Sequence, residues 1–216
     1  MMKNKYFVFI ALILINYCVP KLAVGEAYKL PDPVKEGGMP LNEALNKRQS
    51  QRDYDDSIKI TPEILSQALW SCCGLNREDP LKTTPSATGW YPLMVYIFLE
   101  DGVYKYVSSN HTVIKLLDGD YRSRTGTQTE VVTKACANFV FIGDFKKKSS
   151  MDDDPTHKLR SIYLDTGHYT MALYLFAAAN NMKGVSRAMV DVDSLYELLG
   201  LNQEDYIFAL TFSLGF

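Results

Sequence analysis

The sequence lacks the motifs of several common enzyme classes. It has no H-E-x-x-H, no C-x-x-C, no G-x-S-x-G, and no G-x-G-x-x-G after an expected strand. Zinc hydrolysis, dithiol redox chemistry, serine hydrolysis and tight dinucleotide binding on a Rossmann fold therefore have no support. The acidic run Asp152–Asp154 lacks the alternating oxygen ligands and the turn glycine of a calcium loop. We expect no metal site.

A large excess of charge of either sign is also missing. The 216 residues include 23 basic and 25 acidic side chains, which gives a formal net charge of −2. This balance does not favour bulk binding to nucleic acid or to an anionic membrane surface. Partners must therefore be argued from local sites.

The apolar run near the N-terminus is too short to remain in a bilayer as a spanning helix. Tyr6–Ile15 follows two lysines, and Ala23 and Gly25 supply the small residues of a cleavage site. This layout predicts a signal peptide at residues 1–25 and export of the mature protein to a periplasm or to the medium.

Cysteine is scarce, at four residues. Cys18 raises the alternative of a lipoprotein, but Tyr17 stands where lipid attachment favours a small residue, so we favour soluble export. The other three, Cys72, Cys73 and Cys136, are an odd number for an oxidising compartment. We interpret them as small buried hydrophobic residues.

The mature chain, of roughly 190 residues, has the length of one compact domain. Residues 26–40 are rich in proline and glycine and predict an extended N-terminal strap, followed by a single domain at 41–216. Strands and helices alternate without a regular β-α-β order, which favours the α+β class. We expect helices at 40–45, 61–74, 159–182 and 194–199, strands at 93–99, 103–107, 138–143, 185–190 and 206–214, and a solvated loop at 146–157.

The helix at 159–182 has an unusual composition. Residues 171–179 are apolar on every side, which predicts a long central helix that is buried all round. His168 lies near the expected start of this helix and His111 in an expected turn. We interpret both as packing or capping residues.

Two arginines and a serine form a candidate phosphate site. Arg48, Ser50 and Arg52 alternate along a segment that follows a helix, so an extended backbone would point them to one side. A guanidinium group can bind two phosphate oxygens at once, and a hydroxyl adds a neutral hydrogen bond. A solvated basic turn is the alternative for this short pattern alone.

Two further segments turn the short arginine–serine pattern into a recognisable order of motifs. Thr84-Pro85-Ser86-Ala87 precedes a buried strand, and Leu69-Trp70 is followed by Gly74. In this order the chain resembles the nitroreductase superfamily, nearest to its exported or azoline-forming-dehydrogenase-like branch. The resemblance extends through Gly126-Thr127-Gln128, Asp165-Thr166-Gly167-His168 and Arg187–Asp191, so it covers nearly the whole mature chain.

The resemblance implies a nitroreductase-like fold, with a mixed, mainly antiparallel sheet flanked by helices, in an obligate homodimer that binds FMN at the subunit interface. It implies that Arg48, Gln49, Ser50 and Arg52 hold the phosphate and the ribityl chain. It also implies that Pro85, Ser86 and Ala87 line the isoalloxazine ring from the other subunit, that Gln128 meets the pyrimidine edge, and that Ala188 and Met189 bring backbone to the reactive nitrogen.

The chain departs from the family pattern at three places. Ala188-Met189 replaces the glycine pair or Glu-Gly of many members, Gly89 stands near a common asparagine, and the C-terminus Ser213–Phe216 lacks basic residues. Phosphate binding would then depend more on Arg48 and Arg52, with Arg187 or Arg122 as helpers.

The implied activity is the transfer of hydride or electrons, through FMN, from a reduced donor to a small electron-poor acceptor such as a nitroaromatic or a quinone. The donor would be NAD(P)H, or another donor outside the cytoplasm. In such a reaction the cofactor carries the chemistry, so no side chain is named as a catalytic acid or base. Two alternatives remain open: a flavin-dependent dehydrogenase that oxidises its substrate, and a flavin- or ligand-binding dimer without turnover.

Overall fold

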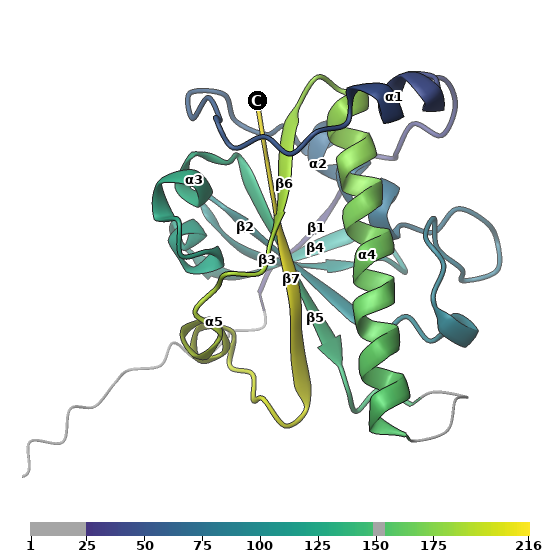
Figure 1. Cartoon of the computed structure of the whole chain (residues 1–216), viewed down its shortest axis with the longest axis vertical. Coiled ribbons are helices and arrows are strands. Elements are labelled where there is room, and N and C mark those ends of the chain that lie inside the picture. The colour runs from purple at the N-terminus through teal and green to yellow at the C-terminus, as the bar shows by residue number, and fades with distance from the viewer. Residues whose placement is uncertain (1–24, 149–153) are drawn as a thin grey trace, which may run out of the picture.

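The computed structural model describes residues 25–148 and 154–216. Residues 1–24, which include Cys18 and all of the predicted signal peptide except Gly25, lie outside these ranges. Asp152 and Asp153 lie outside them as well. A seven-stranded sheet with the order β1-β4-β3-β2-β5-β7-β6 organises the described chain, and each pair of neighbouring strands is antiparallel (Figure 1). The strands are β1 Ala27–Lys29, β2 Leu93–Leu99, β3 Gly102–Val107, β4 Thr112–Asp118, β5 Ala137–Asp144, β6 Lys183–Arg187 and β7 Tyr206–Gly215; the helices are α1 Leu41–Lys47, α2 Pro62–Cys73, α3 Thr129–Lys134, α4 Pro155–Ala179 and α5 Val192–Leu199, with 3-10 turns η1 Ala87–Gly89 and η2 Arg122–Thr125.

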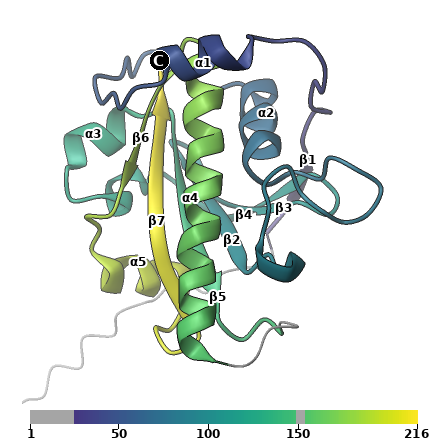
Figure 2. The ribbon, with the colours of Figure 1, turned by 45° about the vertical axis from the view of Figure 1, so that its right-hand side comes forward.

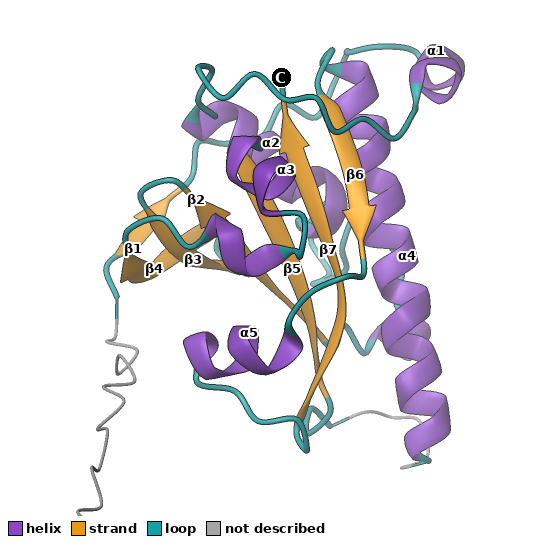
Figure 3. Ribbon diagram, turned by 60° about the vertical axis from the view of Figure 1, so that its left-hand side comes forward, coloured by secondary structure: helices purple, strands orange, loops and turns teal. Residues whose placement is uncertain are grey.

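Helices cover both faces of the sheet. One hydrophobic cluster joins α2 and α4 to one face, and a second joins α5 to the other. Figure 3 shows α4 and α5 on opposite sides of the strands. The α+β class and the mainly antiparallel sheet are therefore confirmed.

Several predicted elements appear where local signals are strong. The Thr61 side chain caps α2 by accepting a hydrogen bond from the N–H of Ile64, Pro62 occupies the first turn, and Gly74 ends the helix. The predicted hairpin of β2 and β3 is present, but its turn lies one residue earlier: Glu100 and Asp101 form the turn, and Gly102, the first residue of β3, already pairs with Leu99. Within the predicted strap, Ala27–Lys29 forms β1 and pairs with β4.

The start of α4 corrects the predicted loop at 146–157. Asp154 caps the helix through the N–H of Thr156, and Pro155 occupies its first position, so His157 is helical. His168 accordingly lies in the middle of α4 and is exposed, so its interpretation as a packing or capping residue is wrong.

The surface of α4 corrects a second prediction. Its inner side packs on the sheet through Ile162, Tyr169 and Leu173, which are fully buried. Tyr163 and Leu164, however, are 50% and 58% exposed, and Met171, inside the all-apolar segment 171–179, is 39% exposed. The helix is therefore not buried all round, and α4 presents apolar side chains on its outer face in the single chain.

The remaining sequence predictions differ in smaller ways. The predicted strand at 185–190 ends at Arg187 in β6, and the sequence patterns did not identify β4 or α3. His111 does lie in a turn, with φ +54°, and its ring contacts the hydroxyls of Ser66 and Tyr106 at 2.7 Å.

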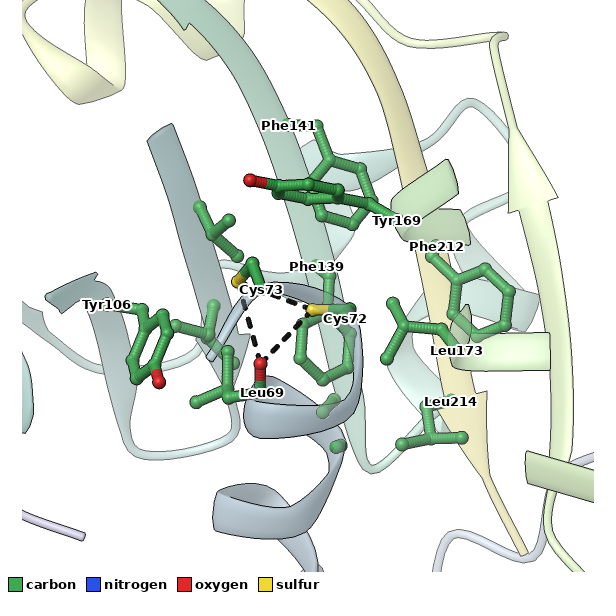
Figure 4. Close-up of a cluster of buried hydrophobic side chains, with 14 of the residues drawn as sticks. Leu69, Cys72, Cys73, Tyr106, Phe139, Phe141, Tyr169, Leu173, Phe212 and Leu214 are labelled. Carbon is green, nitrogen blue, oxygen red and sulfur yellow. Dashed lines mark hydrogen bonds between the residues drawn. The ribbon is translucent and has the colours of Figure 1, made fainter. Parts of the chain in front are cut away.

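The cysteines belong to the core, as predicted. Cys72 and Cys73 are buried at the end of α2 with their Sγ atoms 3.5 Å apart (Figure 4). Cys136 is also buried, and its thiol donates to the carbonyl of Leu214 in β7. Burial raises the pKa of the Cys72 thiol well above its usual value. Tyr169 lies in the same cluster, and its hydroxyl is buried without a hydrogen-bond partner among residues 25–148 and 154–216.

Candidate functional site

The segment after α1 is held against β6. Ser50 forms an isolated parallel bridge with Gly184, and the N–H of Gln51 donates to the carbonyl of Gly184 at 3.1 Å. A Cβ on Gly184 would approach the Phe212 ring to 2.6 Å, so glycine allows this close packing. The backbone contacts place Arg48, Ser50 and Arg52 along the edge of the sheet.

Tyr174 of α4 connects this segment to β6. Its hydroxyl lies 3.1 Å from the Ser50 and Ser186 hydroxyl oxygens, and it accepts the N–H of Ser186 at 2.9 Å. The Arg48 guanidinium lies 5.4 Å from the ring centroid of Tyr174. Burial alone would raise the pKa of Tyr174, but the hydrogen bonds from Ser186 and Ser50 and the charge of Arg48 lower it. The sequence patterns did not identify this residue, because its role depends on contacts between distant segments.

A hollow of about 290 Å³ opens beside these hydroxyls, and we call it the Arg187 hollow. Its lining consists of Arg52, Gln128, Ser186, Arg187, Ala188 and Met189. Five of these six are predicted site residues. The fold therefore brings together side chains that lie as far apart in sequence as Arg52 and Met189.

Arg187 is the most unusual group in the hollow. The residue is 8% exposed, and its Nε atom is buried with no hydrogen-bond partner in the described part of the chain. A Cβ on Gly126 would lie 3.0 Å from Nε and Nη2, so glycine makes room for the guanidinium. Burial lowers the pKa of Arg187, Tyr54 opposes this shift, and Arg52 adds to it. A buried cation without a partner is costly, so the hollow is electrostatically suited to an anion.

The backbone next to Arg187 offers a further donor. The carbonyl of Met189 accepts the N–H of Thr127 at 3.0 Å, while the N–H of Met189 donates no hydrogen bond within residues 25–148 and 154–216. Ala188 is exposed, and Met189 is 69% exposed. The predicted backbone donor is thus available at the edge of the hollow.

The other predicted arginines occupy different positions. Arg48 and Gln49 line a neighbouring hollow of about 440 Å³ together with Asn181 and Lys183, so Arg48 and Arg52 do not line the same one. Arg122 donates to both carboxylate oxygens of Asp120 and to the carbonyl of Ala135, which leaves it committed elsewhere.

The Pro85-Ser86-Ala87 segment lies on the other flank of α4. The Ser86 hydroxyl donates to Asp165 at 2.5 Å and accepts the N–H of Tyr91 at 2.8 Å. Asp165 and Tyr174 are nine positions apart, which corresponds to about 13.5 Å of rise and about two and a half turns, so the two side chains leave the helix on opposite sides. Figure 2 shows η1 and β6 on opposite sides of α4. One chain therefore does not bring this segment to the Arg187 hollow.

Comparison with known proteins decides the family. The model described as the nitroreductase family matches residues 45–216. The chain belongs to the nitroreductase family. It is 27% identical over 184 residues to a Methanocaldococcus jannaschii protein named as a nitroreductase, covering 81% of this chain and 90% of that one.

Solved structures of nitroreductases share the fold. A protein from Ralstonia eutropha, titled as a nitroreductase, matches with a TM-score of 0.80 and 29% identity, covering 88% of each chain. A Desulfovibrio desulfuricans structure, titled as a nitroreductase in complex with FMN, matches with a TM-score of 0.60 and 15% identity over 83% of this chain and 87% of that one. The family makes this chain an oxidoreductase.

The residues of this nitroreductase-family chain fit FMN. An anionic flavin group would give the buried Arg187 guanidinium the partner that the described chain does not supply. Arg48, Arg52, Ser50 and Tyr174 offer cations and hydroxyls for a phosphate and a polyol, and Gln128 offers an amide.

Two other kinds of feature are absent from the described residues. No helix there combines the length and apolarity that crossing a membrane requires. No group of three or more histidine, cysteine or acidic side chains in those ranges has the geometry of a metal site.

Proposed function

We propose that this protein is an FMN-dependent oxidoreductase that works as a homodimer. It would take electrons from NAD(P)H or another reduced donor and pass them to an electron-poor small molecule such as a nitroaromatic or a quinone. The observation that carries the proposal is the Arg187 hollow, in which a buried guanidinium without a partner lies close to the available N–H of Met189.

The Arg187 hollow and the neighbouring residues would have separate tasks. Arg52 in the hollow and Arg48 in the adjacent one would bind the phosphate from two sides, and the nearby Ser50 and Tyr174 hydroxyls would orient the phosphate and the ribityl chain. Arg187 and the Met189 N–H would stabilise negative charge on the reduced ring. Bound FMN supplies the hydride and electron transfer. Gln128 would donate to the pyrimidine edge.

Two exposed apolar surfaces support the homodimer. Leu41 and Leu45 of α1 are 63% and 44% exposed, and α1 packs against α4, whose Tyr163, Leu164 and Met171 are 50%, 58% and 39% exposed. Exposed apolar patches of this kind are typical of interfaces. A second copy docked here could also bring its own Pro85-Ser86-Ala87 segment to the Arg187 hollow.

The decisive experiment measures flavin content. The purified protein should be yellow, and Arg48→Ala combined with Arg52→Ala should lose FMN while keeping its circular dichroism spectrum. Arg77→Ala combined with Lys134→Ala is the matched control, because it removes the same charge from exposed positions outside the hollow. A colourless wild type that takes up no added FMN would refute the proposal, and full flavin occupancy in the double variant would refute the phosphate assignment.

Anaerobic reduction separates the proposed activity from its alternatives. If NADH or NADPH bleaches the bound flavin and a nitroaromatic restores its colour, the proposed direction holds. If neither nicotinamide bleaches it, the donor is a different molecule, in keeping with the predicted export, or the protein is a binding dimer without turnover. Bleaching by a candidate substrate would instead identify the oxidising branch.

A further inference from the structure

Three lysines line a hollow of about 560 Å³, which lies on the same side of α4 as Ser86. Lys82 comes from the loop before Pro85, Lys105 from β3, and Lys147 from the segment after β5. We call this the lysine hollow. It shares no lining residue with the Arg187 hollow.

None of the three ammonium groups has a carboxylate partner in the described chain. Lys82 lies 5.1 Å from the ring centroid of Tyr91, Lys147 donates to the carbonyl of Tyr91 at 2.6 Å, and Lys105 contacts the sulfur of Met94. Lys146, beside Lys147 but outside the lining, does form an ion pair, with Asp205.

One carboxylate lines the lysine hollow, and it is already engaged. Oδ1 of Asp144 accepts the backbone N–H groups of Lys146 and Lys147 at 3.0 and 3.1 Å. Three cations against one anion leave the lining with an excess of two positive charges. Lys147 is exposed as a whole residue, but burial of its ammonium end lowers its pKa, and the charge of Lys82 lowers it further. The charge of Asp144 raises it and only partly offsets these two effects.

Part of the wall between the lysines is apolar, and one of its residues has a strained backbone. Pro92, Val95, Val107 and the Tyr91 ring form this part, while Ser108 and Ser109 add polar groups to the lining. Tyr91 has φ +47°, which is costly for a residue with a bulky side chain, and strain of this kind is concentrated at functional sites. Its hydroxyl accepts the N–H of Lys82 at 3.2 Å, and its own N–H donates to Ser86 at 2.8 Å. Apolar walls between cations suit an organic anion with a flat apolar body better than a bare inorganic ion.

The Ser86 contact connects the lysine hollow to the flavin segment. If Pro85-Ser86-Ala87 of one subunit lines the ring in the other, this hollow lies directly behind that wall. We propose that the lysine hollow binds a small aromatic carboxylate. This inference rests on the lysine hollow alone and goes beyond the proposed function.

Calorimetric titration of the purified full chain with 4-nitrobenzoate tests the binding. The wild type should bind the carboxylate at least tenfold more tightly than the neutral 4-nitrobenzyl alcohol, because only the anion pairs with Lys82 and Lys147. Lys82→Gln combined with Lys147→Gln should weaken 4-nitrobenzoate binding at least tenfold. Lys134→Gln combined with Lys148→Gln, which removes the same charge from exposed positions outside the lining, should leave it within twofold.

A charge-preserving variant controls for folding. Lys82→Arg combined with Lys147→Arg should retain most of the binding, since both cations remain. Equal binding of the acid and the alcohol, or wild-type binding by the double glutamine variant, would overturn the proposal. A protein that holds no flavin but still binds 4-nitrobenzoate through these lysines would leave the binding intact while refuting the proposed enzyme.

Discussion

Replacement of Arg187 by methionine should change flavin binding and stability in opposite directions. The two side chains have similar length, so Met fills the space next to Gly126 without a polar atom. In the flavin-free protein Arg187 is a buried cation close enough to Arg52 for that charge to lower its pKa, and its Nε has no partner among residues 25–148 and 154–216. Removing such a charge is neutral or stabilising when a hydrophobic residue fills the site.

The flavin-bound protein should respond differently. A charge-assisted hydrogen bond contributes about 1.5–3 kcal/mol, and each 1.4 kcal/mol corresponds to a factor of ten in affinity. Arg187→Met should therefore weaken FMN binding about tenfold to about a hundredfold. Fluorescence titration of the flavin-free protein with FMN measures the affinity, and urea unfolding of the same samples measures stability.

Arg124→Met is the matched control, because Arg124 is exposed and its guanidinium donates to the Ser194 hydroxyl rather than facing the hollow. It should leave FMN affinity unchanged. The reasoning is refuted if Arg187→Met keeps the wild-type affinity, since the guanidinium then has no flavin partner. A loss of more than about 2 kcal/mol of flavin-free stability would also refute it, because truncating a satisfied charge carries such a cost.

Three further predictions concern stability and assembly. Tyr169→Phe should leave the free energy of unfolding unchanged or raise it by about 1 kcal/mol, since the Tyr169 hydroxyl has no partner among the described residues. Tyr54→Phe should lower it by about 1 kcal/mol, since the Tyr54 hydroxyl donates to the carbonyls of Gln51 and Ser213. Urea unfolding of both variants measures the difference. Burial raises the pKa of Asp165 despite the Ser86 hydrogen bond, so the folded state favours the protonated carboxyl, and the stability that the protonated form contributes is lost as pH rises through the folded pKa. Asp165→Asn should therefore stabilise the protein at pH 7, and this gain should disappear towards pH 3. An equal gain at both pH values would contradict the reasoning. Leu164→Glu should convert the proposed homodimer into a monomer in light scattering, while a dimer that survives this substitution would place the interface away from the outer face of α4.

The helix caps and turns were predictable because their signals are local. Thr61-Pro62 at the start of α2, Gly74 at its end, and Asp101-Gly102 at the entry to β3 each act through neighbouring backbone. The same kind of signal, Asp154-Pro155, was present at the start of α4 and was obscured by the charged residues around it. Strand β4 was harder to predict, since its burial pattern is irregular along its length.

The sequence by itself determined the α+β class, most elements, and the order of segments that resembles the nitroreductase family, because these depend on composition and on short spacings. Only the tertiary structure decided that Arg187 is buried without a partner, that Tyr174 joins Ser50 to Ser186, and that the lysine hollow exists. Each of these depends on which distant segments pack together. The end of α4 is the same case: in residues 171–179, which are apolar on all sides, periodicity cannot show which side meets the sheet, and packing buries Leu173 while it leaves Met171 39% exposed.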